Sequence, residues 1–339
     1  MTMRFAGLAG MCLLLAVLGC AVAERQERVP AGPLEEARLW LRRNPPDGTN
    51  RAARRERMAV LQEACDRLSL EDYRIYARAW KSNDVARADL SEAEHPALRY
   101  LRDATLAAVE DIRRTRVQQG VAVWHVYNMG HVFKTPTACF GIDLSERYVV
   151  ALVPDLDFLL VTHEHADHHS VPLIEAMLAQ GKPVVTRWFP GTRVLNQSTN
   201  LVLGDIRVRV DIGDHHYRNP AQRDNMLMYE VDCGPAGNHA VIYHSGDGSN
   251  YEKIRPSAPI DLFIVHTSVG MPVAEAVRHL RPKMTFAAHL LELGHSPLPP
   301  HAWRWSFDYA FNVLAEIPER EAAVLTWGER WLLPGTRLE

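Results

Sequence analysis

A nine-residue segment, residues 161–169, holds the side chains with the clearest capacity for chemistry. It reads Val-Thr-His-Glu-His-Ala-Asp-His-His, follows an apolar run and precedes a stretch of helical character. Its imidazoles and carboxylate are ligands that suit zinc. His163 and His165 are two residues apart in extended chain and project to the same side, whereas Asp167 and His168 lie past the bend and can serve a second cation. The segment therefore predicts a centre for two metal ions.

The spacing His163-x-His165-x-Asp167-His168 resembles the signature of the metallo-β-lactamase superfamily, whose members fold as a four-layer αββα sandwich. The resemblance covers roughly residues 121–325 and implies further ligands downstream, each just after a strand. The candidates appear in the expected order: Asp214, His215 and His216 after residues 206–210, Asp247 after residues 240–243, and His289 after residues 284–288.

Carried onto this sequence, the resemblance implies a complete set of ligands for two metals. The set is His163, His165 and His215 for the first metal, Asp167, His168 and His289 for the second, and Asp247 bridging both. A slip of one residue at a strand end reverses which side chain faces the site. The choice between His215 and His216 therefore stays open, with His215 preferred. His289 is preferred to His295 because it follows its strand directly.

Two further residues are implied to support these ligands from behind. Asp143 ends a predicted strand and matches an early aspartate of the family, which holds the histidine loop by hydrogen bonds. The Gly130-His131 pair resembles a Gly-His of the branch that contains the ascorbate-phosphate lactonases and N-acyl phospholipid-cleaving phospholipase D enzymes. For several histidines, His131 among them, the preferred interpretation is an ordinary surface or core residue without a role in the site. These histidines are His125, His131, His239, His295 and His301.

The resemblance implies a hydrolase that attacks an ester, lactone, amide or phosphodiester bond with water activated by two zinc ions. Asp167 would orient the nucleophile and relay its proton. Manganese and iron are alternatives to zinc, but a redox diiron centre is disfavoured, because diiron members of the family carry an acid where His165 stands. The alternatives to such a hydrolase are a true β-lactamase and a non-catalytic envelope protein with a structural metal. A structural zinc has four protein ligands and no open position, so the larger set favours an enzyme.

The elements that must position these residues fall into two regions. Up to residue 119, apolar residues such as Met58, Leu61 and Cys65 recur at helical spacing, which predicts an N-terminal α-helical extension. From residue 120, short β-rich runs alternate with helical stretches, which indicates a layered α/β domain. The runs are residues 121–127, 137–143, 156–162, 206–210, 226–231, 240–244, 262–265 and 284–288, and the helices are residues 171–178, 273–280 and 303–315.

The amino terminus predicts export. Arg4 precedes the apolar run 11–19, the order of a secretory signal. Residues 17–20, Val-Leu-Gly-Cys, resemble a bacterial lipobox, and residues 21–23, Ala-Val-Ala, resemble an ordinary cleavage site. We therefore expect a signal peptide over residues 1–23, a polar tether and helices over residues 24–119, and the catalytic domain over residues 120–339. The mature protein would be periplasmic or an outer-membrane lipoprotein tethered through Cys20.

The amino-acid composition limits which kinds of binding partner are expected. Charged residues make up 23% and hydrophobic residues 47% of the 339-residue chain, as in ordinary globular proteins. The formal net charge of −3 gives no electrostatic reason to expect a nucleic-acid partner. We expect a small-molecule or lipid-like substrate. The candidate walls of its pocket are aromatic: Trp188, Phe189, Trp303, Trp305 and Tyr309.

Overall fold

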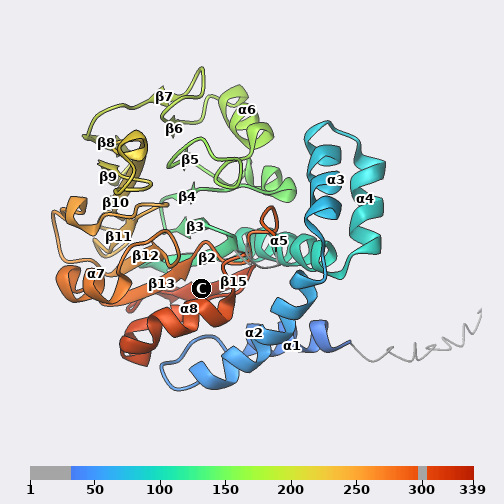
Figure 1. Ribbon diagram of the computed structural model, residues 1–339. Coiled ribbons are helices and arrows are strands. Elements are labelled where there is room, and N and C mark those ends of the chain that lie inside the picture. The colour runs from blue at the N-terminus through green and yellow to red at the C-terminus, as the bar shows by residue number, and fades with distance from the viewer. Residues whose placement is uncertain (1–31, 297–303) are drawn as a thin grey trace, which may run out of the picture.

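The computed structural model describes residues 32–296 and 304–339, and within these ranges a pair of seven-stranded sheets packs face to face (Figure 1). The first sheet has the order β15 (Glu329–Leu332), β2 (Ala122–Tyr127), β3 (Gly130–Lys134), β4 (Cys139–Ile142), β5 (Phe158–Leu160), β6 (Val184–Thr186) and β7 (Arg193–Val194). The second has the order β14 (Ala322–Val324), β13 (Met284–Ala288), β12 (Leu262–His266), β11 (Val241–His244), β10 (Met226–Asp232), β9 (Ile206–Gly213) and β8 (Thr199–Leu203). A short ribbon pairs β1 (Val117–Gln119) with β16 (Arg337–Leu338).

The strands bury both of their faces, which is what a four-layer architecture requires. In β12, Leu262 and Ile264 join the core between the sheets, whereas Phe263 and Val265 join the core under the outer helices. Successive side chains of a strand point to opposite faces, so a continuous apolar run fills two cores at once. Strand β9, next to the edge strand β8, behaves differently: Ile206, Val208 and Val210 are buried, whereas Arg207 is exposed and Arg209 is half-buried.

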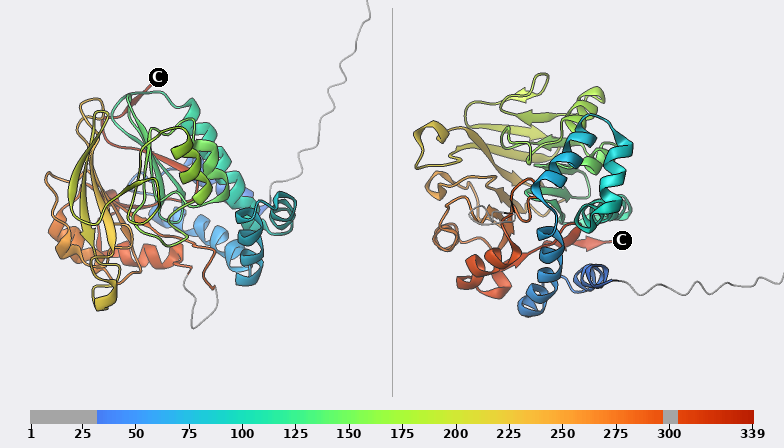
Figure 2. Two further views of the ribbon diagram at one scale, coloured as in Figure 1. Left: turned by 90° about the horizontal axis from the view of Figure 1, so that it is seen from above. Right: turned by 45° about the vertical axis from the view of Figure 1, so that its right-hand side comes forward.

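Helices cover the outer face of each sheet (Figure 2). The first sheet lies under α5 (Pro96–Arg114), α6 (Val171–Ala179) and the 3-10 helix η1 (Arg147–Leu152). The second lies under α7 (Val273–Leu280) and α8 (Phe307–Val313). Short 3-10 helices also lie between these elements, and they are η2 (Pro220–Gln222), η3 (Tyr251–Lys253), η4 (Leu314–Glu316) and η5 (Glu319–Glu321). The predicted αββα sandwich is therefore confirmed.

Strand direction decides where the loops gather. Strands β11, β12, β13 and β14 run parallel, and so do β4, β5, β6 and β7 in the other sheet. The carboxyl ends of parallel strands meet at one edge of a sheet, which is where α/β folds place their ligands. Loops far apart in the sequence therefore meet at this edge of the sandwich.

The N-terminal extension contains α1 (Pro33–Arg43), α2 (Arg51–Asp66), α3 (Leu70–Lys81) and α4 (Val85–Glu94), followed by α5. The helical part of the extension begins at Pro33, inside the region expected to start as a polar tether. Pro33 occupies the first helical turn, where proline is favoured, and the helix buries Ala37 and Leu41. Among the described residues, no helix has the length and apolarity needed to cross a membrane. The expected signal peptide, lipobox and Cys20 lie outside the described residues.

The extension shares its core with the sandwich. Side chains of α2 and α5 belong to the same apolar cluster as residues of β12, β13 and α8. Arg54, which is 2% exposed, pairs with buried Glu329 at 2.7 Å and donates to the carbonyl of Val324 at 3.1 Å. The amide of Phe307, the first residue of α8, donates to Gln62 of α2 at 3.1 Å, so α2 also contacts the start of α8. The helices therefore do not form a separately packed body.

Glu146 yields a prediction about this junction. Its carboxylate is buried and lies 3.5 Å from the hydroxyl of Tyr76 in α3, and burial raises the pKa of Glu146 to about 7. In the folded protein Glu146 therefore favours its protonated form. The stability that this form contributes is fully present below the pKa of 4.5 of the unfolded chain and is lost as the pH rises through about 7. The substitution Glu146→Gln should raise the free energy of unfolding at pH 8 by up to roughly 3 kcal/mol.

The measurement is urea unfolding of wild type and Glu146→Gln at pH 8 and near pH 4.5, where the two should differ little. Glu316→Gln, on an exposed glutamate of the surface, serves as the matched control. An equal difference at both pH values would contradict the assigned protonation.

Candidate metal centre

The candidate ligands come from both sheets and meet at the edge described above. His163, His165, Asp167 and His168 lie in the loop after β5, and Asp247 follows β11. His215 follows β9 and His289 directly follows β13. The amide of Leu227 in β10 donates to the carbonyl of Thr162 at 2.8 Å, which ties the β5 loop to the second sheet.

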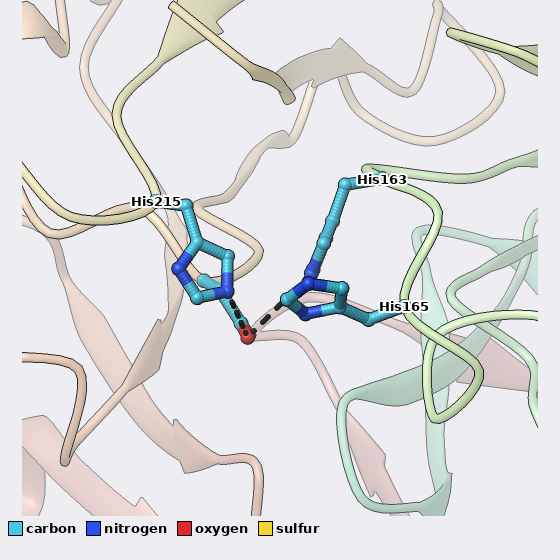
Figure 3. Close-up of side chains that lie close together, drawn as sticks. His163, His165 and His215 are labelled. Carbon is cyan, nitrogen blue, oxygen red and sulfur yellow. Dashed lines mark ion pairs between the residues drawn. The ribbon is translucent and has the colours of Figure 1, made fainter. Parts of the chain in front are cut away.

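One group of ligand atoms gathers around one oxygen of Asp247. The ligand atoms of His163, His165, His215 and Asp247 all lie within 4.8 Å of one another. Oδ2 of Asp247 lies 3.4 Å from Nε2 of His215 and 3.7 Å from Nε2 of His163. Figure 3 shows the rings of His163, His165 and His215 directed toward a common point.

A second group lies beside the first. It consists of Asp167, His168 and His289, with Oδ2 of Asp167 at 3.0 Å from Nε2 of His289. Oδ1 of Asp247 lies 3.1 Å from Nε2 of His168. The two oxygens of Asp247 therefore have their shortest contacts in different groups, the arrangement that a carboxylate between two cations needs.

Unpartnered polar atoms indicate that cations fit here. Several buried ligand atoms have no hydrogen-bond partner, and these are Nε2 of His163, Nε2 of His168, both ring nitrogens of His215, Oδ1 of Asp247 and Nδ1 of His289. Each buried polar atom without a partner costs about 1–3 kcal/mol. Most of these atoms converge on the two groups, and imidazole with carboxylate is a donor set that zinc and other divalent transition metals accept. The residues therefore fit two cations.

Protonation supports the same interpretation. Burial lowers the pKa of His163 well below its ordinary value, and burial also lowers the pKa of His165. Both rings are thus held in the neutral form that ligates. Burial by itself would raise the pKa of Asp247, but His168 and His289 outweigh it and hold that pKa well below the ordinary value. The centre therefore presents the neutral imidazoles of His163 and His165 beside an anionic carboxylate, whereas, against burial, Asp247 and Asp167 raise the pKa of His168 well above its ordinary value.

Asp143 supports the loop after β5 from behind. Fully buried, it accepts hydrogen bonds from the amide and the hydroxyl of Thr162, each at 2.8 Å. Nδ1 of His168 lies 2.8 Å from its Oδ2. A carboxylate on one ring nitrogen fixes the orientation of the imidazole and leaves the other nitrogen for a metal. Nε2 of His168 accordingly faces Asp247.

Among the described residues, the hydrogen bond of His131 goes to the turn between β2 and β3 and not to a candidate ligand. The register of β2 with β3 places His131 opposite His125, and their rings stack at 4.9 Å. Nδ1 of His131 bonds the carbonyl of Met129 at 2.9 Å, and His244 reaches the same carbonyl at 3.1 Å. These histidines hold the turn between β2 and β3.

Two residues that the sequence analysis missed lie inside the site. His266 ends β12, stacks on His289 with ring centroids 4.1 Å apart, and forms a third potential ligand group with Asp247 and His289. Its position at the end of a predicted strand was the available signal. Nδ2 of Asn128 lies 3.2 Å from Oδ2 of Asp167, so the turn between β2 and β3 positions that acid. No local pattern announced Asn128.

The structure separates the open alternatives. His215 is buried in the first group, whereas His216 is exposed. His295 belongs to none of the potential ligand groups among the described residues, unlike His289.

The expected aromatic walls also divide. Trp305 packs edge-on to His289 with centroids 4.4 Å apart, and Trp188 lies 5.0 Å from the ring of His169. Tyr309 is exposed on α8, and Phe189 packs against the core under the first sheet. Trp303 and His301 lie outside the described residues.

Comparison with known proteins places the fold. The sequence model of a family described as beta-lactamase superfamily domain matches residues 119–289. A solved structure described as a possible metal-dependent hydrolase from Veillonella parvula is 16% identical with a TM-score of 0.50, and the match covers 63% of this chain and 100% of that chain. An isothiocyanate hydrolase from Delia radicum gut bacteria is 14% identical with a TM-score of 0.44, covering 62% and 99%. No curated protein matches the chain.

The adjacent histidines provide a matched test of the first ligand group. His215→Ala should lower the affinity for one zinc equivalent by at least about 100-fold, because it removes a ligand instead of an outer support. His216→Ala should bind both equivalents as wild type does, because His216 lies on the surface. Zinc titration by calorimetry and metal analysis by mass spectrometry measure both. A loss in His216→Ala, or none in His215→Ala, would contradict the arrangement.

Proposed function

Because the chain belongs to the beta-lactamase superfamily, we propose that it is a hydrolase with a binuclear metal centre, with zinc as the first candidate metal. Its substrate would be a small molecule or a lipid-like molecule with an ester, lactone, amide or phosphodiester bond. The observation that carries the proposal is Asp247, whose two oxygens approach different ligand groups. A structural zinc site would close around one ion with four ligands.

Two cations would supply an attacking water of lowered pKa and would polarise the bond under attack. The residue of the chain that would act on this water is Asp167. Oδ2 of Asp167 is held by Asn128 at 3.2 Å and by His289 at 3.0 Å. Its side chain is 19% exposed, more than those of Asp247 and His168. Asp167 would therefore orient the water and accept its proton.

A nucleophilic cysteine is not the alternative. Cys65, Cys139 and Cys233 are all buried with free thiols. Burial raises the pKa of Cys139 to about 12 and raises the pKa of the other two as well. A thiol must ionise to attack, so none of these three residues offers a nucleophile.

Purified protein loaded with zinc tests the function. We expect about two metal equivalents per chain and hydrolysis of at least one of three probes: bis(4-nitrophenyl) phosphate, an acyl homoserine lactone, or the β-lactam nitrocefin. Asp167→Asn should lower kcat on that probe by on the order of 100-fold or more, because the variant loses its proton acceptor. Asp308→Asn, at an exposed carboxylate paired with Arg55, should leave kcat unchanged.

The outcomes separate the alternatives. Cleavage of nitrocefin alone would assign a true β-lactamase. One bound equivalent and no hydrolysis of any probe would overturn the proposal in favour of a metal-binding envelope protein.

We also propose export and lipidation at Cys20, on the basis of the lipobox-like residues 17–20. Expression in a bacterial host with radiolabelled palmitate should label wild type and place it in the membrane fraction. Cys20→Ala should abolish the label, whereas Cys12→Ala, inside the apolar run, should retain it. Labelling of Cys20→Ala, or none of wild type, would contradict lipidation.

A further inference from the structure

A second acid and histidine pair lies in the turn after β13, outside the ligand groups. Nδ1 of His295 bonds Oε2 of Glu292. Glu292 is buried, and its Oε1 accepts from the amide of Gly294 at 2.8 Å. The side chain of His295 is 45% exposed. With Nδ1 committed to the carboxylate, Nε2 is the ring nitrogen that is left for a substrate.

The pair lies one aromatic ring away from the candidate metal centre. The ring of Trp305 packs edge-on to His295 with centroids 4.2 Å apart, and edge-on to His289 at 4.4 Å. It also lies 5.3 Å from the ring of His266. Trp305 thus contacts both the second ligand group and His295, which places His295 at the border of the candidate centre.

The charges around His295 favour its protonated form. Burial alone would lower the pKa of His295, but Glu292 raises it, and Asp167 and Asp247 of the candidate centre raise it further. The nearby cation is Arg304, whose Nε donates to the carbonyl of His295 at 2.9 Å. A histidine whose Nδ1 bonds the buried carboxylate of Glu292 is stabilised as a cation, and it can give up a proton where negative charge develops.

The N-terminal extension holds this turn in place. Arg304 is buried and donates to the carbonyls of Cys65 and Leu68 at the end of α2 as well as to His295. Tyr73 of α3 packs so closely on Gly294 that a Cβ there would lie 3.2 Å from its ring. The hydroxyl of Tyr127 in β2 accepts from the amide of Leu293 at 2.8 Å. Helices, sheet and turn therefore fix the pair together.

We propose that His295, oriented by Glu292, is the catalytic acid that protonates the leaving group of the hydrolysis. The inference deepens the proposed function and rests on it. The oxygen of water forms a bond to the carbonyl carbon or phosphorus, and the bond to the leaving oxygen or nitrogen breaks. The leaving atom keeps the electron pair and takes the proton from Nε2 of His295. Asp167 accepts the proton of water, and exchange with solvent restores both groups.

Leaving-group dependence distinguishes an acid from a structural residue. On the bond class that the wild type cleaves, His295→Gln should lower kcat by on the order of 100-fold for a phenyl or alkyl leaving group, which needs protonation. It should lower kcat less than about 5-fold for 4-nitrophenyl, which leaves as an anion. Bound metal should stay at the wild-type content. His239→Gln, at an exposed histidine paired with Asp232, is the matched control and should change neither rate.

The pH dependence gives an independent readout. An acid must be protonated, so kcat for the poor leaving group should fall as the pH rises through the pKa of His295. Glu292→Gln should move this fall to lower pH, because it removes the carboxylate that stabilises the cation. Nuclear magnetic resonance titration of the His295 ring in metal-free protein should show the same order, with wild type above the ordinary value of 6.5 and the variant below wild type.

Each result decides one point. An equal loss for both leaving groups with an unchanged pH profile, or loss of metal in His295→Gln, would overturn the acid while leaving the hydrolase intact. A pKa of His295 that Glu292→Gln does not change would also overturn it. A wild-type protein with two metals and no hydrolysis of any probe would instead overturn the proposed function itself.

Discussion

The burial of one carboxylate among imidazoles is the constraint on which the site depends. Asp247 is 4% exposed and lies within 3.7 Å of ring nitrogens from both ligand groups. A charge taken out of water is costly unless opposite charge and hydrogen bonds compensate it. Here the facing nitrogens of His163 and His168 have no hydrogen-bond partner. The compensation that this donor set is suited to receive is a pair of cations.

The sandwich makes this arrangement stable by keeping the polar edge separate from the apolar layers. In a strand such as β12, successive side chains enter two different cores. Only its last residue, His266, lies at the candidate metal centre. Parallel pairing of β11, β12 and β13 brings the ends of three such strands together. The loop after β5 faces them from the other sheet, and Asp143 holds it from below.

The helical extension contributes to the same edge. Arg54 joins α2 to buried Glu329 of β15, and Arg304 joins the end of α2 to the turn that carries His295. A buried guanidinium that donates to several carbonyls fixes its partners with directional bonds. The extension is therefore bonded directly to the turn that carries His295. Its position also explains how Tyr73, far away in sequence, contacts the turn at Gly294.

The sequence by itself determined the features that depend on the spacing of residues along the chain. His163, His165, Asp167 and His168 are separated by at most five residues, so any strand-to-helix bend keeps them together. The alternation of β9 and the double-sided burial of β12 follow from the two-residue period of a strand. Tertiary structure alone decided that His215 and not His216 faces inward, that His266 and Asn128 join the site and that His131 does not. Those outcomes depend on strand order and register between segments far apart in the chain, which local spacing does not encode.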